Sequence, residues 1–253
     1  MTRHINDNNG DDMEIPMGNE TIRPFIRPNE EVPPTIRSRH AYAYGKCARL
    51  LYYTNQYKKI LYTKRDWSNI NRGDDVHNAL ENMICKQDTG WIREMDANVE
   101  IPEINGIKYV GTHTDLRNSS TVIEIKPVYT RMAYYQTLLQ RFVFPHKTFF
   151  VLEYAKGLMS EDFRVILDSN WKRHLLPIKA DYRTALVYVG RILTSLEIRP
   201  PRIPDGIPVE NPCKSCLYLD LCYQEPDSTW ESFKGASEHN IRVLADAFMV
   251  NLK

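Results

Sequence analysis

The hydrophobic positions of the chain change period between residues 72 and 126, and this change predicts an α/β fold. Residues 72–87 have apolar side chains at helical spacing, and these side chains line one face: Val76, Leu80, Met83 and Ile84. From about residue 96 the spacing becomes that of strands, in the segments DANVEIPEI, IKYVGTHTDL and STVIEIKPV. An Asn-Gly pair lies between the first two segments and predicts a hairpin turn.

The second half of the chain continues this mixture of elements. KTFFVLEYA and FRVILDSN predict two further strands separated by a Lys-Gly turn. Apolar side chains at helical spacing predict helices over residues 131–144, 178–197 and 236–252, and a Pro-Pro pair stops the second of them. The pattern as a whole therefore predicts helices and strands mixed along one α/β core.

The composition is that of a soluble globular protein. Of the 253 residues, 42% are hydrophobic and 26% are charged. No apolar run approaches the roughly 20 residues of a membrane span. The first residues, MTRHINDNNGDD, lack the apolar segment of a secretory signal. We therefore expect a cytoplasmic protein with no membrane partner.

Charge is unevenly distributed along the chain. Residues 1–35 contain three arginines and seven acidic residues, which indicates an acidic, mostly disordered lead-in. Because the whole chain has a net charge of +1, the remaining body is mildly basic. Such a body suits a nucleic-acid partner, and it equally suits a neutral soluble protein. The expected parts are the lead-in 1–35, an N-terminal helical part 36–70, a core 71–199, a cysteine-rich segment 200–230 and a C-terminal helix 231–253.

The predicted hairpin GTHTDLRNSSTVIEIK carries the candidate chemistry. Asp115 and Glu124 are expected to converge on one divalent ion from adjacent strands, with a further oxygen from the carbonyl of Ile125. Mg²⁺ and Mn²⁺ prefer oxygen ligands and Mn²⁺ also accepts imidazole, so His77 on the preceding helix can complete the site. Lys126 shares a strand face with Glu124. There it can orient or help deprotonate a water, or stabilise charge on a phosphate.

Each of these residues also has an ordinary structural explanation. A Glu-x-Lys pair on a strand is commonly a solvated pair, and a single aspartate commonly caps a turn. A histidine beside an apolar stripe commonly lies at the edge of a core. The order Gly-x3-His, Gly-x3-Asp and Glu-x-Lys, on a helix and two strands, favours a site over these explanations.

This order of motifs resembles a known nuclease family. The segments GDDVH, GTHTD and EIK, which end at residues 77, 115 and 126, resemble the successive motifs of the RecB-type branch of the PD-(D/E)xK nucleases. The resemblance implies a restriction-endonuclease-like core. In that branch the following helix carries a Gln-x3-Tyr motif. Gln136 matches its glutamine, whereas Gln140 occupies the position of its tyrosine.

Five cysteines in a cytoplasmic chain indicate a metal site rather than disulfides. Cys213, Cys216 and Cys222 cluster near the end of the chain, and Cys47 is the candidate for a fourth ligand. Four thiolates hold either a 4Fe–4S cluster or a zinc ion, and the local spacing does not distinguish the two. Unligated buried cysteines are the third alternative. Cys85 is left over and is predicted to be a small core residue.

One cysteine before the nuclease motifs and three after them resembles the pattern of the CRISPR-associated RecB-like exonucleases, the Cas protein numbered four. The resemblance covers roughly residues 38–225. It implies an iron–sulfur subdomain built from both chain ends and metal-dependent cleavage of DNA, mostly single-stranded and often from the 5′ end. It also implies trimming of spacer precursors with the CRISPR integrase, and a homo-oligomer as in some relatives. The residues implied are His77, Asp115, Glu124 and Lys126 for the nuclease site, and Cys47, Cys213, Cys216 and Cys222 for the cluster.

Single-stranded DNA is held by cations along its backbone and by aromatic rings under its bases. The candidates for these contacts near the predicted site are Arg117, Arg131, Tyr134 and Gln136. Three more residues follow Cys47 and are expected to line a path for the strand: Arg49, Tyr52 and Tyr53. An ordinary surface or core-edge position is the alternative for each of them.

The sequence therefore predicts a metal-dependent single-stranded DNA exonuclease that acts 5′ to 3′. Its expected cofactors are a 4Fe–4S cluster and Mn²⁺ or Mg²⁺. One alternative is a non-catalytic DNA-binding scaffold of an integration complex. A second is a viral or repair nuclease outside CRISPR. A third is a zinc-stabilised nuclease of unrelated role, such as repair or restriction. A complete His, Asp, Glu and Lys set favours catalysis, since an inactive relative has no need to keep all four.

Overall fold

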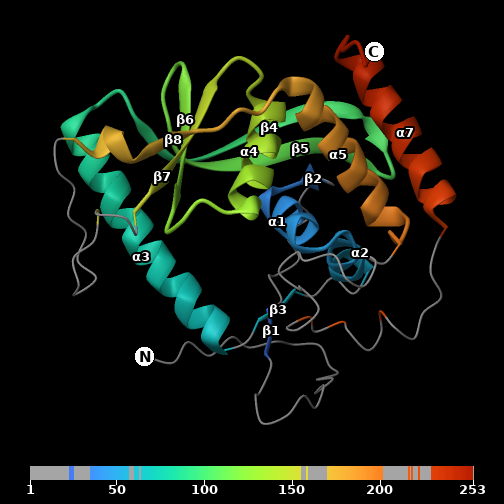
Figure 1. Cartoon of the computed structure of the whole chain (residues 1–253), viewed down its shortest axis with the longest axis horizontal. Helices are drawn as coiled ribbons and strands as arrows, with labels where there is room; N and C mark the ends of the chain where they lie inside the picture. The colour runs from blue at the N-terminus through green and yellow to red at the C-terminus, as the bar shows by residue number, and fades with distance from the viewer. Residues whose placement is uncertain are drawn as a thin grey trace.

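The computed structural model describes residues 23–25, 35–56, 60–62, 64–154, 170–201 and 229–252, together with 158, 216, 218 and 222 (Figure 1). Cys213, most of the predicted lead-in and most of the predicted strand FRVILDSN lie outside the described residues. What the sequence predicts for those segments stays a prediction.

Within the described residues, a six-stranded mixed sheet forms the centre of the fold. Strand β5 (Ile107–Arg117) pairs along its length with antiparallel β4 (Ile92–Ile104). The other edge of β5 is shared by β2 (Thr35–Ile36), which is parallel, and by β6 (Thr121–Lys126), which is antiparallel. Strand β7 (Thr148–Glu153) runs parallel to β6, and β8 (Leu175–Pro177) is antiparallel to β7. This mixture of helices and mixed strands confirms the α/β class.

The β4–β5 hairpin turns where the sequence predicts. Asn105 and Gly106 have φ angles of 53° and 75°, the left-handed values that an Asn-Gly turn requires. Ile104 and Ile107 pair directly on either side of the turn. The turn closes the hairpin, and a register shift between Glu100 and Ile104 separates it from the regular pairing that carries residues 111–117.

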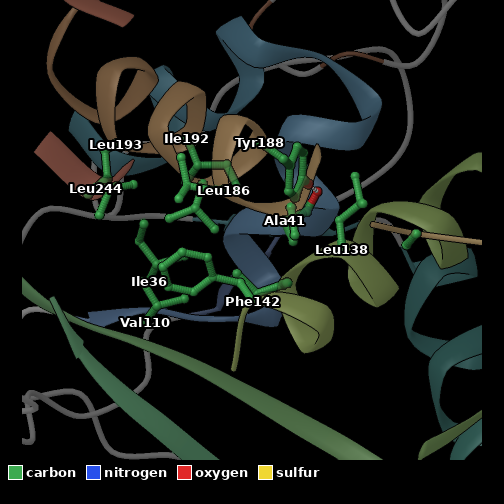
Figure 2. Packing of buried hydrophobic residues seen from close by; sticks show 14 of the residues in the cluster. Ile36, Ala41, Val110, Leu138, Phe142, Leu186, Tyr188, Ile192, Leu193 and Leu244 are labelled. Atoms are coloured by element: carbon green, nitrogen blue, oxygen red, sulfur yellow. Dashed lines mark hydrogen bonds between the residues drawn. The ribbon is translucent and has the colours of Figure 1, made fainter. Parts of the chain in front are cut away.

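One core cluster lies between the sheet and the helices on one of its faces. Figure 2 shows Ile36 and Val110 of the sheet beside Phe142 of α4 and Leu186 of α5. All four are buried, so this layer excludes water from one side of β5. The helices that contribute buried side chains to it are α1 (Ser38–Lys46), α2 (Ala48–Gln56), α4 (Arg131–Val143), α5 (Tyr182–Glu197) and α7 (Trp230–Ala247).

A second core cluster involves helix α3 (Lys64–Gln87). The buried stripe of α3, with Leu80 at its centre, packs with Ile123 and Ile125 of β6. Val122 points to the opposite face of the strand and belongs to the first cluster. Strand β6 is thus apolar on both faces, and its polar residues Glu124 and Lys126 interrupt that pattern.

Several element boundaries differ from the predicted ones. Helix α3 begins at Lys64 rather than near residue 72, and residues 48–56, for which no separate element was predicted, form α2. The prediction of a helix over residues 236–252 is wrong at both ends, because α7 spans Trp230–Ala247. Thr229 caps its start. After its end Met249 has a φ of 53° and the amide of Val250 bonds the carbonyl of Ala245, which is a C-terminal capping pattern.

Two short strands lie outside the main sheet. β1 (Arg23–Phe25), within the predicted lead-in, pairs with antiparallel β3 (Ile60–Tyr62). Among the described residues, no helix is both long enough and apolar enough to span a bilayer.

Candidate metal centre and active site

Asp115 and Glu124 meet where strands β5 and β6 separate. Leu116 of β5 pairs with Ile123 of β6, so the antiparallel register continued by one residue sets Asp115 opposite Glu124. Both carboxyl groups are buried. The amide of Ile125 donates to Oδ2 of Asp115 at 2.6 Å. Ile125 thus contacts the site through its nitrogen, and the part predicted for its carbonyl oxygen stays a prediction.

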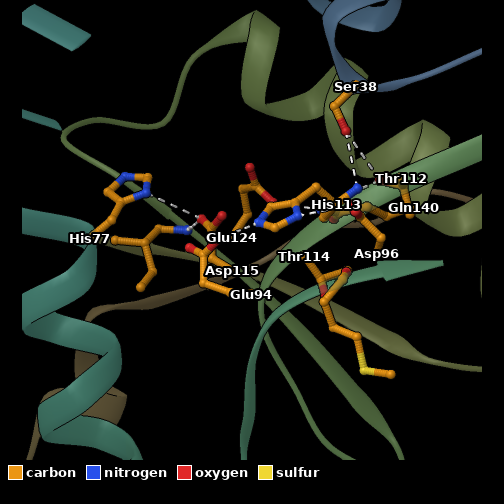
Figure 3. A network of polar contacts seen from close by, with 12 residues as sticks. Ser38, His77, Glu94, Asp96, Thr112, His113, Thr114, Asp115, Glu124 and Gln140 are labelled. Atoms are coloured by element: carbon orange, nitrogen blue, oxygen red, sulfur yellow. Dashed lines mark hydrogen bonds and ion pairs between the residues drawn. The ribbon is translucent and has the colours of Figure 1, made fainter. Parts of the chain in front are cut away.

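Both oxygens of Glu124 are engaged by protein donors. Nζ of Lys126 lies 2.6 Å from Oε1, as expected for two residues on the same face of a strand. Nε2 of Gln140, on α4, donates to Oε2 at 2.5 Å and to the carbonyl of His113 at 3.2 Å (Figure 3). Glu124 is therefore held in one orientation before any ligand binds.

Gln140 was not among the predicted site residues. The motif resemblance places the glutamine of the family pattern at Gln136, four residues earlier on α4. Gln136 is only partly buried, whereas Gln140 is 1% exposed and reaches Glu124. The departure from the family pattern at position 140 thus brings a hydrogen-bond donor to the site.

Helix α3 approaches Asp115 from the opposite side and brings two side chains to it. Nδ1 of His77 lies 3.8 Å from Oδ2 of Asp115. Glu81 is one turn later, so it shares the face of His77. One ligand atom from each of His77, Glu81 and Asp115 lies within 4.8 Å of the others. These three side chains could together hold a metal ion.

Glu81 is the residue of this centre that the sequence analysis missed. Its side chain is fully buried, and the described residues give its carboxylate oxygens no hydrogen-bond partner other than the neighbouring carboxyl of Glu94. A buried carboxylate in this state is costly unless a proton or a cation accompanies it. The available signal was the His-x3-Glu spacing on a helix, which places an acid between apolar positions 80 and 84.

Burial and mutual repulsion govern the titration of these carboxyl groups. Burial raises the pKa values of Asp115 and Glu124, and the repulsion between them raises that of Glu124 further. Burial, with Glu94 and Asp115 nearby, raises the pKa of Glu81 to about 9. A cation at the centre would favour the ionised forms and reverse these shifts.

The pKa of Lys126 is set by its neighbouring carboxylates more than by its burial. Burial by itself lowers its pKa, but Glu124 and Asp115 raise the pKa by more, so it ends above its ordinary value. The ammonium group is therefore charged at neutral pH. This favours the predicted role of Lys126 in stabilising negative charge over the alternative role in deprotonating water.

The side chains predicted to contact DNA differ in their exposure and in the residues they contact. Arg131 is exposed and donates to the hydroxyl of Tyr135 at 2.7 Å. Arg117 lies over the ring of Phe144, 5.4 Å from its centroid. Tyr134 packs partly against the first core cluster. The roles in DNA binding predicted for these residues and for Gln136 stay predictions.

The predicted path for DNA along α2 is wrong for two of its three residues. Arg49 is 2% exposed and Tyr53 is 1% exposed, so neither presents a surface to a strand. Tyr53 instead stacks on Tyr218, with ring centroids 5.6 Å apart. Both are buried because α2 packs against segments near the end of the chain.

Arg49 joins the two cysteine-bearing ends of the chain. Nη1 donates to the carbonyl oxygen and to Sγ of Cys222, each at 3.0 Å, and Nε donates to the carbonyl of Pro200 at 2.7 Å. A guanidinium donor suits a sulfur that carries negative charge, as a metal-bound thiolate does. Cys47, Cys85, Cys216 and Cys222 are free of disulfides, and Cys85 lies half-buried at the edge of the second core cluster.

No protein-family model matches the sequence, and no curated protein matches it. Among solved structures, the chain is similar to the crystal structure of SSO0001, with a TM-score of 0.49. The two share 17% sequence identity over 77% of this chain and 88% of that chain. This similarity is too low to assign a fold family or a function.

Proposed function

We propose that the protein is a metal-dependent DNA nuclease with a restriction-endonuclease-like core. The observation that carries this proposal is the convergence of His77, Glu81 and Asp115 within 4.8 Å, beside the Glu124–Lys126 pair. Oxygen and imidazole donors of this kind fit Mn²⁺ or Mg²⁺. The resemblance of the motifs to RecB-type nucleases adds DNA as substrate, with single strands cut from the 5′ end.

The residues of the site would share the work of cleavage. His77, Glu81 and Asp115, with Glu124 beside them, are proposed to hold a divalent ion, which when bound would activate the attacking water and neutralise charge on the phosphodiester. Lys126, held charged by two carboxylates, would stabilise the negative charge that develops on the phosphoryl oxygens. Gln140 keeps Glu124 oriented, since it donates to the oxygen that Lys126 leaves free.

A 4Fe–4S cluster on Cys47, Cys213, Cys216 and Cys222 is proposed as a structural part of the same protein. The hydrogen bond from Arg49 to Sγ of Cys222 fits a thiolate ligand at that position. A cluster there would connect the helical N-terminal part to the end of the chain. Protein colour distinguishes the alternatives, because an iron–sulfur protein is brown and a zinc protein is colourless. Processing of spacer precursors with a CRISPR integrase remains the proposed setting.

The test is cleavage of end-labelled DNA by the purified full chain. Single- and double-stranded substrates, labelled at the 5′ or the 3′ end, are incubated with Mn²⁺ or Mg²⁺. Asp115→Asn and Lys126→Met are each expected to lower the cleavage rate on the order of 100-fold or more. Lys108→Met is the matched control, because Lys108 lies on β5 with an exposed side chain.

Two outcomes would contradict the proposal. Equal cleavage by the wild type and both site variants would place catalysis elsewhere. No cleavage under any metal, with DNA binding intact, would favour a non-catalytic DNA-binding scaffold. The label that disappears first reports polarity, so the 5′-to-3′ direction is checked in the same experiment.

A further inference from the structure

A cavity of about 310 Å³ lies at the end of strand β5 that is far from the candidate active site. It is lined by the ends of three elements: Asn55 and Gln56 of α2, Asn105 and Ile107 at the β4–β5 turn, and Leu196 and Glu197 of α5. Ile107 precedes Asp115 on β5 by eight residues, which is roughly 26 Å at the rise of a strand. The cavity is therefore separate from the nuclease site, and its volume is near the lower end of the range of ligand pockets, roughly 300–1,000 Å³.

Three carboxamide groups at this cavity are held by the last turns of α5. Nδ2 of Asn55 donates to the carbonyl of Leu196 at 2.9 Å, and Nε2 of Gln56 donates to the same carbonyl at 3.4 Å. Nδ2 of Asn105 donates to the carbonyl of Leu193 at 3.3 Å. In each group the nitrogen is bonded to α5, and no described residue donates to the amide oxygen. The three oxygens are therefore available as hydrogen-bond acceptors.

The cavity also has a negative electrostatic potential. Helices α2 and α5 both end at it, so the negative ends of two helix dipoles lie there. Neither helix has a basic residue in its last turn, where a cation would compensate the dipole. Glu197 adds an exposed carboxylate that forms no ion pair with a described residue. A ligand with positive charge would supply the compensation that the described residues do not give.

The rest of the lining is apolar. Leu196 is 6% exposed, and Ile107 packs against the first core cluster, so both side chains are fixed by the core. Methylene groups of a ligand gain free energy when they leave water for contact with such side chains. Mg²⁺ suits the cavity less well, because it demands a near-ideal octahedron of oxygens and usually binds through carboxylates and waters. The lining instead suits a ligand that carries hydrogen-bond donors on an aliphatic chain.

We propose that this cavity binds an aliphatic diamine or polyamine. One protonated amino group would lie among the amide oxygens of Asn55, Gln56 and Asn105, beside the Glu197 carboxylate. An ammonium has three N–H donors and no acceptor, which matches a set of groups that only accept. The methylenes of the ligand would lie along the apolar lining. Because α2, the β4–β5 turn and α5 all contribute to the cavity, the bound amine would join them and stabilise the folded chain.

The test is isothermal titration calorimetry of the full chain with putrescine and spermidine at constant ionic strength. The wild type is expected to bind both amines saturably, and to bind the uncharged diol of the same length as putrescine at least about 10-fold more weakly. Glu197→Gln is expected to weaken amine binding about 10-fold, because it removes the charged acceptor. Glu100→Gln is the matched control, since it removes the same charge from an exposed position on β4 outside the cavity.

A second variant tests the amide oxygens. Asn105→Gly removes one of them, and glycine accepts the φ of 53° that this turn position requires. We expect it to weaken amine binding by roughly 2- to 10-fold, the effect of one hydrogen bond. Asp115→Asn should bind the amines as the wild type does, because the nuclease site lies elsewhere on β5. Circular dichroism checks that each variant is folded.

Three results would overturn the proposal. The first is equal amine affinity in the wild type and in both cavity variants. The second is binding of the diol as tight as that of putrescine, which would show that positive charge is not recognised. The third is loss of amine binding in Asp115→Asn, which would place the amines at the nuclease site. None of these measurements depends on DNA cleavage, so the proposed nuclease function and this inference stand or fall separately.

Discussion

Gln140 on α4 and Glu124 on β6 are joined by a buried 2.5 Å hydrogen bond, and the same amide nitrogen bonds the carbonyl of His113 on β5. A single side chain thus holds together the two strands that carry the candidate site. We expect Gln140→Leu to leave Oε2 of Glu124 without its donor and to raise the pKa of Glu124 further. Stability should fall by about 1–3 kcal/mol, as measured by urea unfolding.

The matched control for this change is Gln136→Leu, one turn earlier on the same helix. Gln136 is partly buried, and we expect its loss to leave the site intact. DNA cleavage should therefore fall in Gln140→Leu and change little in Gln136→Leu. If cleavage instead falls in Gln136→Leu and changes little in Gln140→Leu, the functional glutamine is Gln136, as in the family pattern.

Arg49 gives a prediction about how the two ends of the chain are connected. Arg49→Met removes three hydrogen bonds and leaves a buried acceptor at Pro200 and two part-buried acceptors at Cys222. We expect the free energy of unfolding to fall by about 3 kcal/mol, together with a loss of bound iron or zinc. Arg242→Met, at an exposed position on α7, should change neither quantity. If the metal content stays constant in Arg49→Met, Arg49 does not support metal binding at the cysteines.

Glu81 predicts a pH dependence of stability when divalent cations are removed by a chelator. Its pKa is about 9 in the folded protein and 4.5 ordinarily, so the folded state keeps a proton that the unfolded state releases. The free energy of unfolding should therefore fall as the pH rises from about 4.5 towards 9. Glu81→Gln cannot lose this proton, so its slope should be shallower. Parallel curves for the two proteins would show that Glu81 is not the titrating group.

Two glycine-to-alanine substitutions are expected to change the stability in opposite directions. A Cβ at position 190 on α5 would lie 3.2 Å from the backbone nitrogen and Cα of Ile241 on α7. Gly190→Ala must therefore push the helices apart, and we expect a loss of about 1–3 kcal/mol. A Cβ at Gly235 on α7 meets nothing within 4 Å. Gly235→Ala should gain up to about 1 kcal/mol from helix propensity. Thermal unfolding measures both.

The local elements of this protein follow from its sequence. The hairpin at Asn105 and Gly106 forms because few residues other than Asn and Gly accept the positive φ angles that the turn needs. The apolar stripe of α3 packs on the second core cluster as its spacing predicts. The close approach of Asp115, Glu124 and Lys126 also follows, since the period of a strand and one turn suffice to align them.

Tertiary structure alone decided the rest of the candidate site. Glu81 looks like an ordinary helical acid until α3 packs on the sheet and buries it beside Asp115. Arg49 meets Cys222 across 173 positions, a pairing that no local pattern contains. Periodicity reports the neighbours of a residue along the chain. The partners that neutralise a buried charge are set by how distant elements pack.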